Sequence, residues 1–376
     1  MTVPHLLTAP IAPRSATAEA AARRRLDALV KPLGALGRLE DIAAWLAGAQ
    51  DRCPPAPLDR VRVVIFAGDH GVADEGVSAY PREVTAAMVA AFLGGVAGVS
   101  VLARSHGAEV RVLDLGVRVD LPNAPPDVTR FKVRQGSGDI SRQDALTAVE
   151  LATALEAGAA IAEEEISAGA DLLIPGDMGI GNTTVAAALV AAALGLTGED
   201  VVGSGTGVSG LAFVHKRAII DMALARPRSD GPLGQLVALG SADAAATVGF
   251  LIRAAARSTP VLLDGVFSCA CALVASRLAP DAVDWWLAGH RSTEPAQGLA
   301  LRALGLSPLL DVGMRLGEGS GAMLAVPVVR AAQALLAQMG TLEDLNLGGA
   351  PDGVSGGAVD RAGISAVDGA APGGPS

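Results

Sequence analysis

A glutamate flanked by glycines stands near the C-terminal end of the sequence, in Arg315-Leu-Gly-Glu-Gly-Ser-Gly321. Glu318 in this setting is poor helix material and has no packing role of its own. Glycines on both sides let other groups close around the carboxylate and exclude water, which raises its pKa and makes it a useful base. The simpler interpretation is a favourable negative charge at a helix N-terminus. We predict that Glu318 is a catalytic proton acceptor.

Two glycine-rich segments have the chemistry of anion-binding loops. They are Gly176-Asp-Met-Gly-Ile-Gly-Asn-Thr-Thr184 and Gly203-Ser-Gly-Thr-Gly-Val-Ser-Gly210, and each precedes a predicted helix. Glycines allow close backbone approach, and a helix N-terminus offers free N–H groups to a phosphate. A helix cap would account for only one of the three polar residues that end the first segment. We therefore predict that both segments bind a ligand.

Lys216 lies one or two turns into the helix that follows the second segment. It could reach the same anion, or it could be a solvated surface lysine, and the sequence favours neither interpretation. The second segment also contains Gly205-x-Gly207-x-x-Gly210, the spacing of a dinucleotide-binding turn. The acid expected about 20 residues later is missing, because Asp221 lies too close.

Further polar residues follow short apolar runs. Asp69 and His70 end one such run; they could be catalytic or could orient the loop, and we favour a structural role for His70. Tyr80, the only tyrosine, lies in a loop that could wall an aromatic base. Asp264 ends Val261-Leu-Leu-Asp264 and has the character of a ribose-hydroxyl ligand.

The segment Gly289-His-Arg-Ser-Thr-Glu294 also follows an apolar run. Its His290, Ser292 and Glu294 could bind hydroxyl groups in the same way, or they could only shape a loop.

The strands and helices around these clusters must position them. In the sequence, short apolar runs that predict strands alternate with segments of helical periodicity. The predicted strands cover residues 62–67, 110–115, 171–175, 201–202, 260–264 and 284–288. Helices are predicted within 18–50, within 82–104 and over 316–345. This alternation is typical of an α/β protein with a parallel sheet and helices on both faces, here Rossmann-like. Because ligands bind at the carboxyl ends of such strands, we expect the polar clusters to converge.

Three regions are expected along the chain. Residues 58–304 form the large α/β domain. Residues 1–57 and residues 305–347 pack together as a small helical subdomain. The tail, residues 348–376, is rich in Gly, Ala, Pro and Ser without periodicity, so we expect it to be disordered.

Composition excludes several classes of function. The net charge of −10 argues against a nucleic-acid or anionic-membrane partner. Cys53, Cys269 and Cys271 are too few and too badly spaced for a disulfide framework or a CxxC metal site. The N-terminus lacks a signal-peptide pattern, and the apolar helix predicted at 185–196 is too short to span a bilayer. We expect a soluble, cytoplasmic protein.

These clusters, in this order, resemble the nicotinate-nucleotide–dimethylbenzimidazole phosphoribosyltransferase family of cobalamin biosynthesis. The resemblance runs from about Pro32 to about Leu345. Its most specific parts are Gly68-Asp-His-Gly-Val72, the segment 176–184 and the segment 315–321. Several collinear matches at sensible separations are a strong signal, whereas one alone would be weak.

The resemblance implies that nicotinate mononucleotide donates its 5-phosphoribosyl group to 5,6-dimethylbenzimidazole, giving α-ribazole 5′-phosphate and nicotinate. Glu318 would remove the benzimidazole N–H proton while the other nitrogen attacks C1′ with inversion. The implied base-binding residues are Ser78, Tyr80, Met88, Met178 and Leu316. The implied nucleotide- and phosphate-binding residues are Asp177, Gly179, Gly181, Asn182, Thr183, Thr184, Gly203, Ser204, Gly205, Lys216, Asp243, Asp264 and Ser292.

No metal and no cofactor are expected. Nicotinate leaves from a pyridinium, so the leaving group needs neither a metal nor an acid. A transferase that releases pyrophosphate would need Mg²⁺ held by acids, and no strand-borne Asp-Asp or Asp-Glu pair precedes a Thr-Gly loop. The expected partners are the two small-molecule substrates, and the resemblance implies a homodimer.

The sequence departs from the family pattern at four positions. Leu239-Gly-Ser-Ala-Asp243 stands where many members have Gly-Gly-x-Glu, and Val266 replaces a phenylalanine that could stack on a ligand. Gln297 occupies a position that is often histidine, and Asp177 replaces a glutamate seen in some members. These changes bear on the ribose and base contacts rather than on the reaction class.

Two other functions compete with this one. An NAD(P)-dependent oxidoreductase would use Gly205-Thr-Gly-Val-Ser-Gly210 as its dinucleotide turn. A non-catalytic nucleotide-binding module would bind a mononucleotide without turnover, and Glu318→Gln would then leave binding unchanged.

Overall fold

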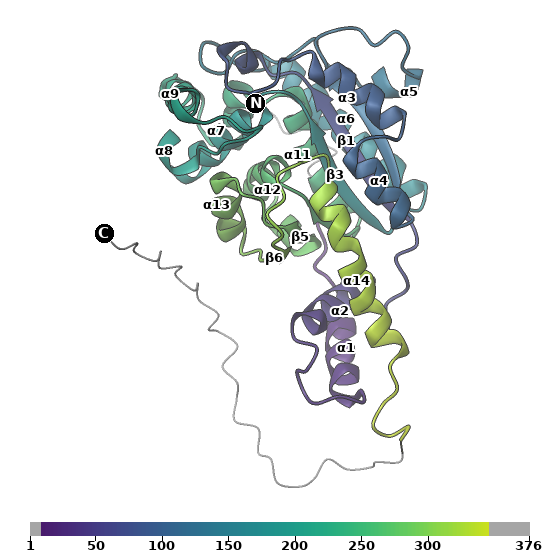
Figure 1. Cartoon of the computed structure of the whole chain (residues 1–376). Coiled ribbons are helices and arrows are strands. Elements are labelled where there is room, and N and C mark those ends of the chain that lie inside the picture. The colour runs from purple at the N-terminus through teal and green to yellow at the C-terminus, as the bar shows by residue number, and fades with distance from the viewer. Residues whose placement is uncertain (1–8, 346–376) are drawn as a thin grey trace, which may run out of the picture.

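The computed structural model describes residues 9–345, and its centre is one sheet of six parallel strands in the order β2-β1-β3-β4-β5-β6 (Figure 1). The predicted α/β class is confirmed. The strands are β1 (Val61–Gly68), β2 (Glu109–Gly116), β3 (Leu172–Met178), β4 (Val261–Leu263), β5 (Trp286–His290) and β6 (Pro308–Leu310).

Helices cover both faces of the sheet, because its strands are apolar on both sides. In β1, Val64 and Phe66 join one hydrophobic core, whereas Val63, Ile65 and Ala67 join the other. The first core is closed by α6 (Ala148–Ser167), α7 (Asn182–Leu194), α9 (Gly210–Ala225), α10 (Gly231–Leu239), α11 (Ala242–Ala256), α12 (Val266–Leu278) and α13 (Pro295–Leu304). The second is closed by α3 (Val84–Leu93), α4 (Gly98–Ser105) and α14 (Ser320–Gln338) together with the N-terminal helices.

Short elements complete the described chain. They are η2 (Gly71–Glu75), α5 (Pro126–Thr129), α8 (Gly198–Val201) and η3 (Pro280–Trp285). The strand predicted at 201–202 is wrong, since residues 198–201 form α8. The side chains of Thr197 and Asp200 form a reciprocal capping box that starts this helical turn.

All strands are parallel, but the direction in which successive strands are added to the sheet changes at β1. The chain runs from β1 outward to β2 at the edge, then returns to place β3 on the other side of β1. Crossovers leaving in opposite directions open a crevice outside the carboxyl ends of β1 and β3. The glycine-rich segment 176–184 begins within β3, so the fold brings it to this crevice.

A small helical bundle extends from the sheet (Figure 1). It combines α1 (Ala16–Ala28), α2 (Arg38–Ala49) and the C-terminal part of α14. Arg25 donates hydrogen bonds to the carbonyl oxygens of Leu336 and Ala337, which ties α1 to the last turn of α14. The N- and C-terminal segments therefore meet as the sequence predicts.

The boundary predicted for this subdomain at residue 305 differs from the structure. Residues 308–310 form the edge strand β6 of the large sheet, and the first turns of α14 pack against β3 and β5. A three-residue strand gives too short an apolar run to be detected by periodicity. The tail predicted to be disordered, 348–376, lies outside the described residues.

Two helical stretches, Val84–Ser105 and Ser320–Gln338, are long and apolar enough to cross a membrane by length and composition alone. Both are longer than the apolar helix predicted at 185–196. The first is interrupted in the fold, since α3 ends at Leu93 and α4 begins at Gly98. The second is α14, most of whose apolar window is buried in the core.

Helices α6 and α11 cross at an unusually short separation. A Cβ atom at Gly158 would overlap the carbonyl of Ala246, and one at Gly249 would overlap the carbonyl of Leu155. Because glycine has no side chain, the two helix backbones are in direct contact at these points. The protein interior is closely packed, so there is no free space for an added methyl group.

Gly158→Ala is therefore expected to lower the free energy of unfolding by about 1–3 kcal/mol, the usual cost of overpacking. Gly298→Ala is the matched control, because a Cβ there meets only the end of Arg302 at 3.6 Å. It should leave stability unchanged or raise it by up to about 1 kcal/mol through helix propensity. Urea denaturation of both variants measures this, and equal effects would contradict the packing argument.

Candidate active site

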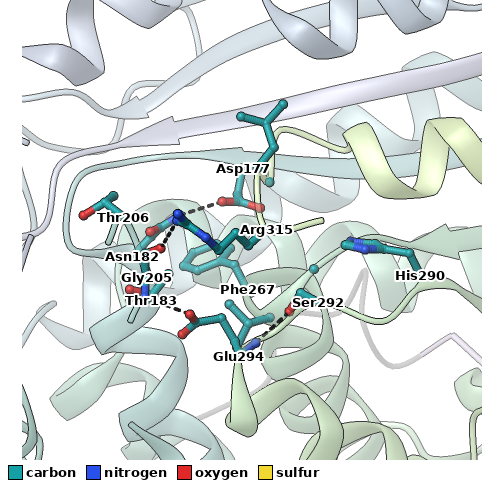
Figure 2. Close-up of a pocket in the computed structure, with 14 residues that line it drawn as sticks. Asp177, Asn182, Thr183, Gly205, Thr206, Phe267, His290, Ser292, Glu294 and Arg315 are labelled. Atoms are coloured by element: carbon teal, nitrogen blue, oxygen red, sulfur yellow. Dashed lines mark hydrogen bonds between the residues drawn. The ribbon is translucent and has the colours of Figure 1, made fainter. Parts of the chain in front are cut away.

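A pocket opens at the carboxyl ends of β3, β4 and β5 (Figure 2). Its lining comes from five separate segments of the chain, which confirms that the polar clusters converge. The lining residues are Asp177, Asn182, Thr183, Gly205, Thr206, Gly265, Val266, Phe267, His290, Ser292, Glu294, Arg315, Leu316 and Gly317.

The first glycine-rich segment forms the turn from β3 into α7. Gly181 caps α7 with a left-handed backbone (φ 94°), and Asn182 and Thr183 of the first helical turn line the pocket, so the positive end of the helix dipole stands beside it. Asn182 Nδ2 donates to Asp177 Oδ2 at 2.6 Å. Thr183 lines the pocket, whereas Thr184 is fully buried behind it.

The second segment is held by buried charges. Lys216 Nζ donates to Thr183 Oγ1 at 2.9 Å and to the Gly203 carbonyl at 3.1 Å, which joins the two glycine-rich segments. Gly205 N donates to Glu294 Oε1 at 2.8 Å, and Arg315 Nη1 donates to the Gly205 carbonyl at 2.8 Å. Such a loop, fixed on both sides, can present its amides to an anion without reorganising.

Lys216 is fully buried, so its interpretation as a solvated surface lysine is wrong. Burial lowers the pKa of its ammonium group, and the charge of Glu294 opposes that shift only in part. Its third donor position can serve a ligand bound between the two segments.

Glu318 does not line this pocket, but it directly follows the lining residues 315–317. Its backbone is left-handed (φ 66°), a conformation that a non-glycine residue adopts only when its surroundings impose it. Oε2 accepts the N–H of Val99 at 3.2 Å, at the N-terminal turn of α4. Burial raises the carboxyl pKa, the Val99 bond partly opposes this, and the charge of Asp264 raises it further. The result is a carboxylate with the properties of a general base.

Of the residues predicted to contact the base, Leu316 lies beside Glu318. Leu316 is 55% exposed, and its Cδ2 atom and the Glu318 carboxylate both approach the position of a Cβ at Gly98. Met88 on α3 and Met178 at the end of β3 are half-buried and pack against the second core. Tyr80 is 56% exposed.

The loop that carries Tyr80 is bonded to the second glycine-rich segment. Thr206 Oγ1 lies 3.0 Å from Ser78 Oγ and accepts the N–H of Ala79 at 2.9 Å. The segment predicted to wall the base and the segment predicted to hold the nucleotide thus form one continuous rim.

Two predicted nucleotide ligands lie behind the pocket rather than in its lining. Asp243 is fully buried, and its carboxylate faces His70 Nε2 at 3.4 Å. Burial lowers the pKa of His70, but the neighbouring charge of Asp243 outweighs this and leaves the pKa raised. Asp264 is also fully buried, and both its oxygens accept backbone N–H groups of residues 319 and 322.

Four predicted ligands of the glycine-rich segments also do not line the pocket, namely Gly179, Gly181, Gly203 and Ser204. Gly179 packs against the Gly68 carbonyl and the ring of His70.

Within residues 9–345, no three His, Cys, Asp or Glu side chains are grouped so that they could hold a metal ion.

A family model described as phosphoribosyltransferase matches residues 11–346. The chain belongs to this phosphoribosyltransferase family. The resemblance predicted from the motifs is confirmed, and the protein is an enzyme of the pentosyltransferase class.

Relatives with this family's name are similar over nearly their whole length. The nicotinate-nucleotide–dimethylbenzimidazole phosphoribosyltransferase of Mycobacterium avium (strain 104) is 57% identical over 337 residues, covering 89% of this chain and 95% of the relative. That of Mycobacterium tuberculosis (strain ATCC 25618 / H37Rv) is 55% identical over 338 residues, covering 89% and 93%. The crystal structure of the enzyme of the same name from Thermus thermophilus matches with a TM-score of 0.84 at 44% identity, covering 89% of this chain and 100% of that one.

Membership of this phosphoribosyltransferase family replaces the oxidoreductase alternative, and the fold agrees. A dinucleotide turn joins a strand to a helix. Here the segment 203–210 follows the helix α8 instead.

The departures from the phosphoribosyltransferase family pattern have physical counterparts. The ring lost at Val266 is replaced one position later, because Phe267 lines the pocket. Gln297 Nε2 donates to the carbonyls of Asp264 and His290 at 2.9 Å each, so it joins the ends of β4 and β5.

Sequence reasoning missed Thr206, Phe267 and Arg315 as lining residues. Arg315 stands in the same motif as Glu318, so its position carried a usable signal. Phe267 is the first aromatic residue after the strand end at Asp264, which could also have marked it. Thr206 had no signal beyond its place in a glycine-rich segment.

Asp177 is the most perturbed acid of the pocket. Burial and the charges of Asp264, Asp243 and Glu318 raise its pKa to about 8, although the Asn182 bond opposes the shift. A carboxyl group that stays protonated near neutral pH can donate a hydrogen bond to a ligand.

This raised pKa predicts a pH dependence of stability. Between the ordinary aspartate value of 3.8 and about 8, the native state holds a proton that the unfolded state has released. Stability contributed by this group therefore falls as pH rises through that window. Asp177→Asn removes the dependence, so the variant should gain stability relative to the parent between about pH 5 and about pH 9.

Urea denaturation of both proteins at the two pH values measures the difference. Asp281→Asn, at an exposed aspartate, is the matched control and should follow the parent. Parallel curves for the parent and Asp177→Asn would show that Asp177 is ionised in the native state.

Proposed function

We propose that this enzyme transfers the 5-phosphoribosyl group of nicotinate mononucleotide to 5,6-dimethylbenzimidazole. The products are α-ribazole 5′-phosphate and nicotinate, and the reaction serves assembly of the nucleotide loop of cobalamin. The observation that carries the proposal is the buried Glu318 carboxylate, held in a left-handed backbone beside a pocket built from two anion-binding segments. The names of the relatives from Mycobacterium and Thermus support the choice of substrates.

The donor nucleotide fits the pocket between the two glycine-rich segments. Its phosphate would bind at the positive end of the α7 dipole, with the buried ammonium group of Lys216 behind Thr183 adding a favourable charge. Ser292 and the protonated Asp177 line the same pocket and offer hydroxyl and carboxyl donors to the ribose. Phe267 provides an apolar wall for the pyridine ring.

The acceptor base would lie on the Glu318 side of the segment 315–317. The apolar side chains of Met88, Met178 and Leu316 can cover its faces, with Ser78 and Tyr80 at the rim. A base held beside Glu318 would attack C1′ from the face opposite nicotinate. Attack from that face inverts C1′ and gives an α product from a β nucleotide.

Proton removal is the task that remains for the protein. One nitrogen of the base attacks C1′ as the bond between C1′ and the nicotinate nitrogen breaks. The electron pair of the broken bond stays on the pyridine nitrogen of nicotinate. Glu318 accepts the proton from the other nitrogen, which prevents a positive charge from accumulating on the base. Its raised pKa brings the carboxylate closer to the basicity that this step needs.

The homodimer that the resemblance implies and the cytoplasmic location expected from the composition stay predictions.

Glu318→Gln is expected to lower kcat by about 1000-fold or more while the affinity for nicotinate mononucleotide changes less than about threefold. The amide keeps the size and the Val99 hydrogen bond but cannot accept the proton. The measurement is formation of nicotinate and the ribosylated base, followed by mass in the absence of added metal. Glu163→Gln, on the outer surface of α6, is the matched control and should keep full activity.

Absence of product from the folded parent enzyme would refute the proposed substrates. A loss of only about tenfold in Glu318→Gln would point to a positioning role for this residue instead. A non-catalytic nucleotide-binding module would show unchanged binding and no turnover in both proteins.

A further inference from the structure

The helix that follows Glu318 begins without a cap of its own. Gly319 is the N-cap residue of α14, and no side chain within the helix bonds its first turn. A Cβ at Gly319 would lie 2.9 Å from Val63 Cγ1 and 3.3 Å from Ile174 Cγ2, so the sheet leaves room only for glycine. The usual Ser, Thr, Asp or Asn cap is thereby excluded at this position.

Asp264 supplies the missing cap from the end of β4. Its Oδ2 accepts the N–H of Gly319 at 3.0 Å, and its Oδ1 accepts the N–H of Ala322 at 2.8 Å. The carboxylate is fully buried and stands at the positive end of the helix dipole, which compensates its charge. Two buried, charge-assisted hydrogen bonds are strong enough to fix the start of the helix.

Asp264 is itself held in place by its neighbours. Gln297 bonds its carbonyl, Ser268 Oγ accepts its N–H at 2.9 Å, and His290 Nε2 lies 3.4 Å from its Oδ1 atom. These contacts come from α12, β5 and α13, so the carboxylate is anchored to the regular elements around the sheet.

The capped turn fixes the residue that precedes it. Glu318 adjoins Gly319, and its carbonyl packs so tightly on Gly176 of β3 that a Cβ there would overlap it. The Glu318 backbone is therefore held between β3 on one side and the Asp264-bonded amide of Gly319 on the other. This clamp can maintain its left-handed conformation, which costs free energy when unsupported.

We propose that Asp264 is a positioning residue that holds Glu318 in its reactive geometry by capping α14 from β4, and that it is not a ligand of the ribose. This inference rests on the proposed function, in which Glu318 is the base. Both oxygens of Asp264 accept backbone N–H groups, and the side chain is fully buried behind the pocket lining, out of reach of a substrate hydroxyl in this arrangement.

Asp264→Asn tests the proposal with little change of shape. The amide keeps one acceptor oxygen but turns an N–H₂ group toward a backbone N–H, so one cap bond is lost. We expect kcat to fall by about 100-fold, the effect of misplacing a reacting group by about 1 Å, with KM for nicotinate mononucleotide within about threefold of the parent. Thr147→Ala removes the side-chain cap of α6, far from the pocket, and should leave kcat within about twofold.

Hydrogen exchange gives a second readout that needs no substrate. Amides in the peptide spanning residues 317–323 should exchange at least about tenfold faster in Asp264→Asn than in the parent, whereas Thr147→Ala should leave them unchanged. If Asp264→Asn does not fold, Asp264→Glu, which keeps both acceptor oxygens on a longer arm, is measured in the same way and should show an intermediate effect.

The outcomes separate the alternatives. A large rise in KM for the nucleotide with unchanged exchange would make Asp264 a ribose ligand and overturn the proposal. Unchanged kcat and unchanged exchange would overturn it as well. If the parent enzyme makes no product from the proposed substrates, the proposed function fails, while the exchange of residues 317–323 still decides whether Asp264 fixes the Glu318 segment.

Discussion

The start of α14 is pressed directly onto the sheet, and the rest of the site is arranged around that contact. Glycine at 176 and at 319 removes the side chains that would keep helix and sheet apart. The chain that enters α14 must then turn sharply at Glu318. The Glu318 side chain points toward α4, where its carboxylate accepts the N–H of Val99. The residues just before this turn, Arg315, Leu316 and Gly317, line the pocket. One steric constraint thus brings the pocket lining and the Glu318 carboxylate together in one short segment.

Burying several carboxylates at one sheet edge is costly, and each is compensated differently. Glu318 meets the N-terminus of α4, Asp264 meets the N-terminus of α14, and Asp243 faces His70. Asp177 has only the neutral amide of Asn182 as a partner, and burial together with the neighbouring carboxylates raises its pKa to about 8. Helix ends and a histidine are the partners of the other three acids.

Much of this architecture follows from sequence pattern. Runs of apolar residues predicted five of the strands, and two glycine-rich segments, one after β3 and one after the helical turn α8, marked loops that reach the pocket. The failures are local and have physical causes: β6 is only three residues long, and the valines at 201–202 belong to a turn that the Thr197 and Asp200 side chains cap. The pairing of Asp264 with α14 joins residues 55 or more positions apart, which no local pattern encodes.

The helix α14 also connects two parts of the molecule that a domain description separates. Its 19 residues extend for about 28 Å, from the turn after Glu318 to the bundle formed with α1 and α2. Because Arg25 holds the far end of this helix, the helix acts as a lever whose support lies outside the pocket. The N-terminal helices therefore pack on the same helix that begins directly after Glu318, so a substitution there changes the support of that helix without touching the pocket.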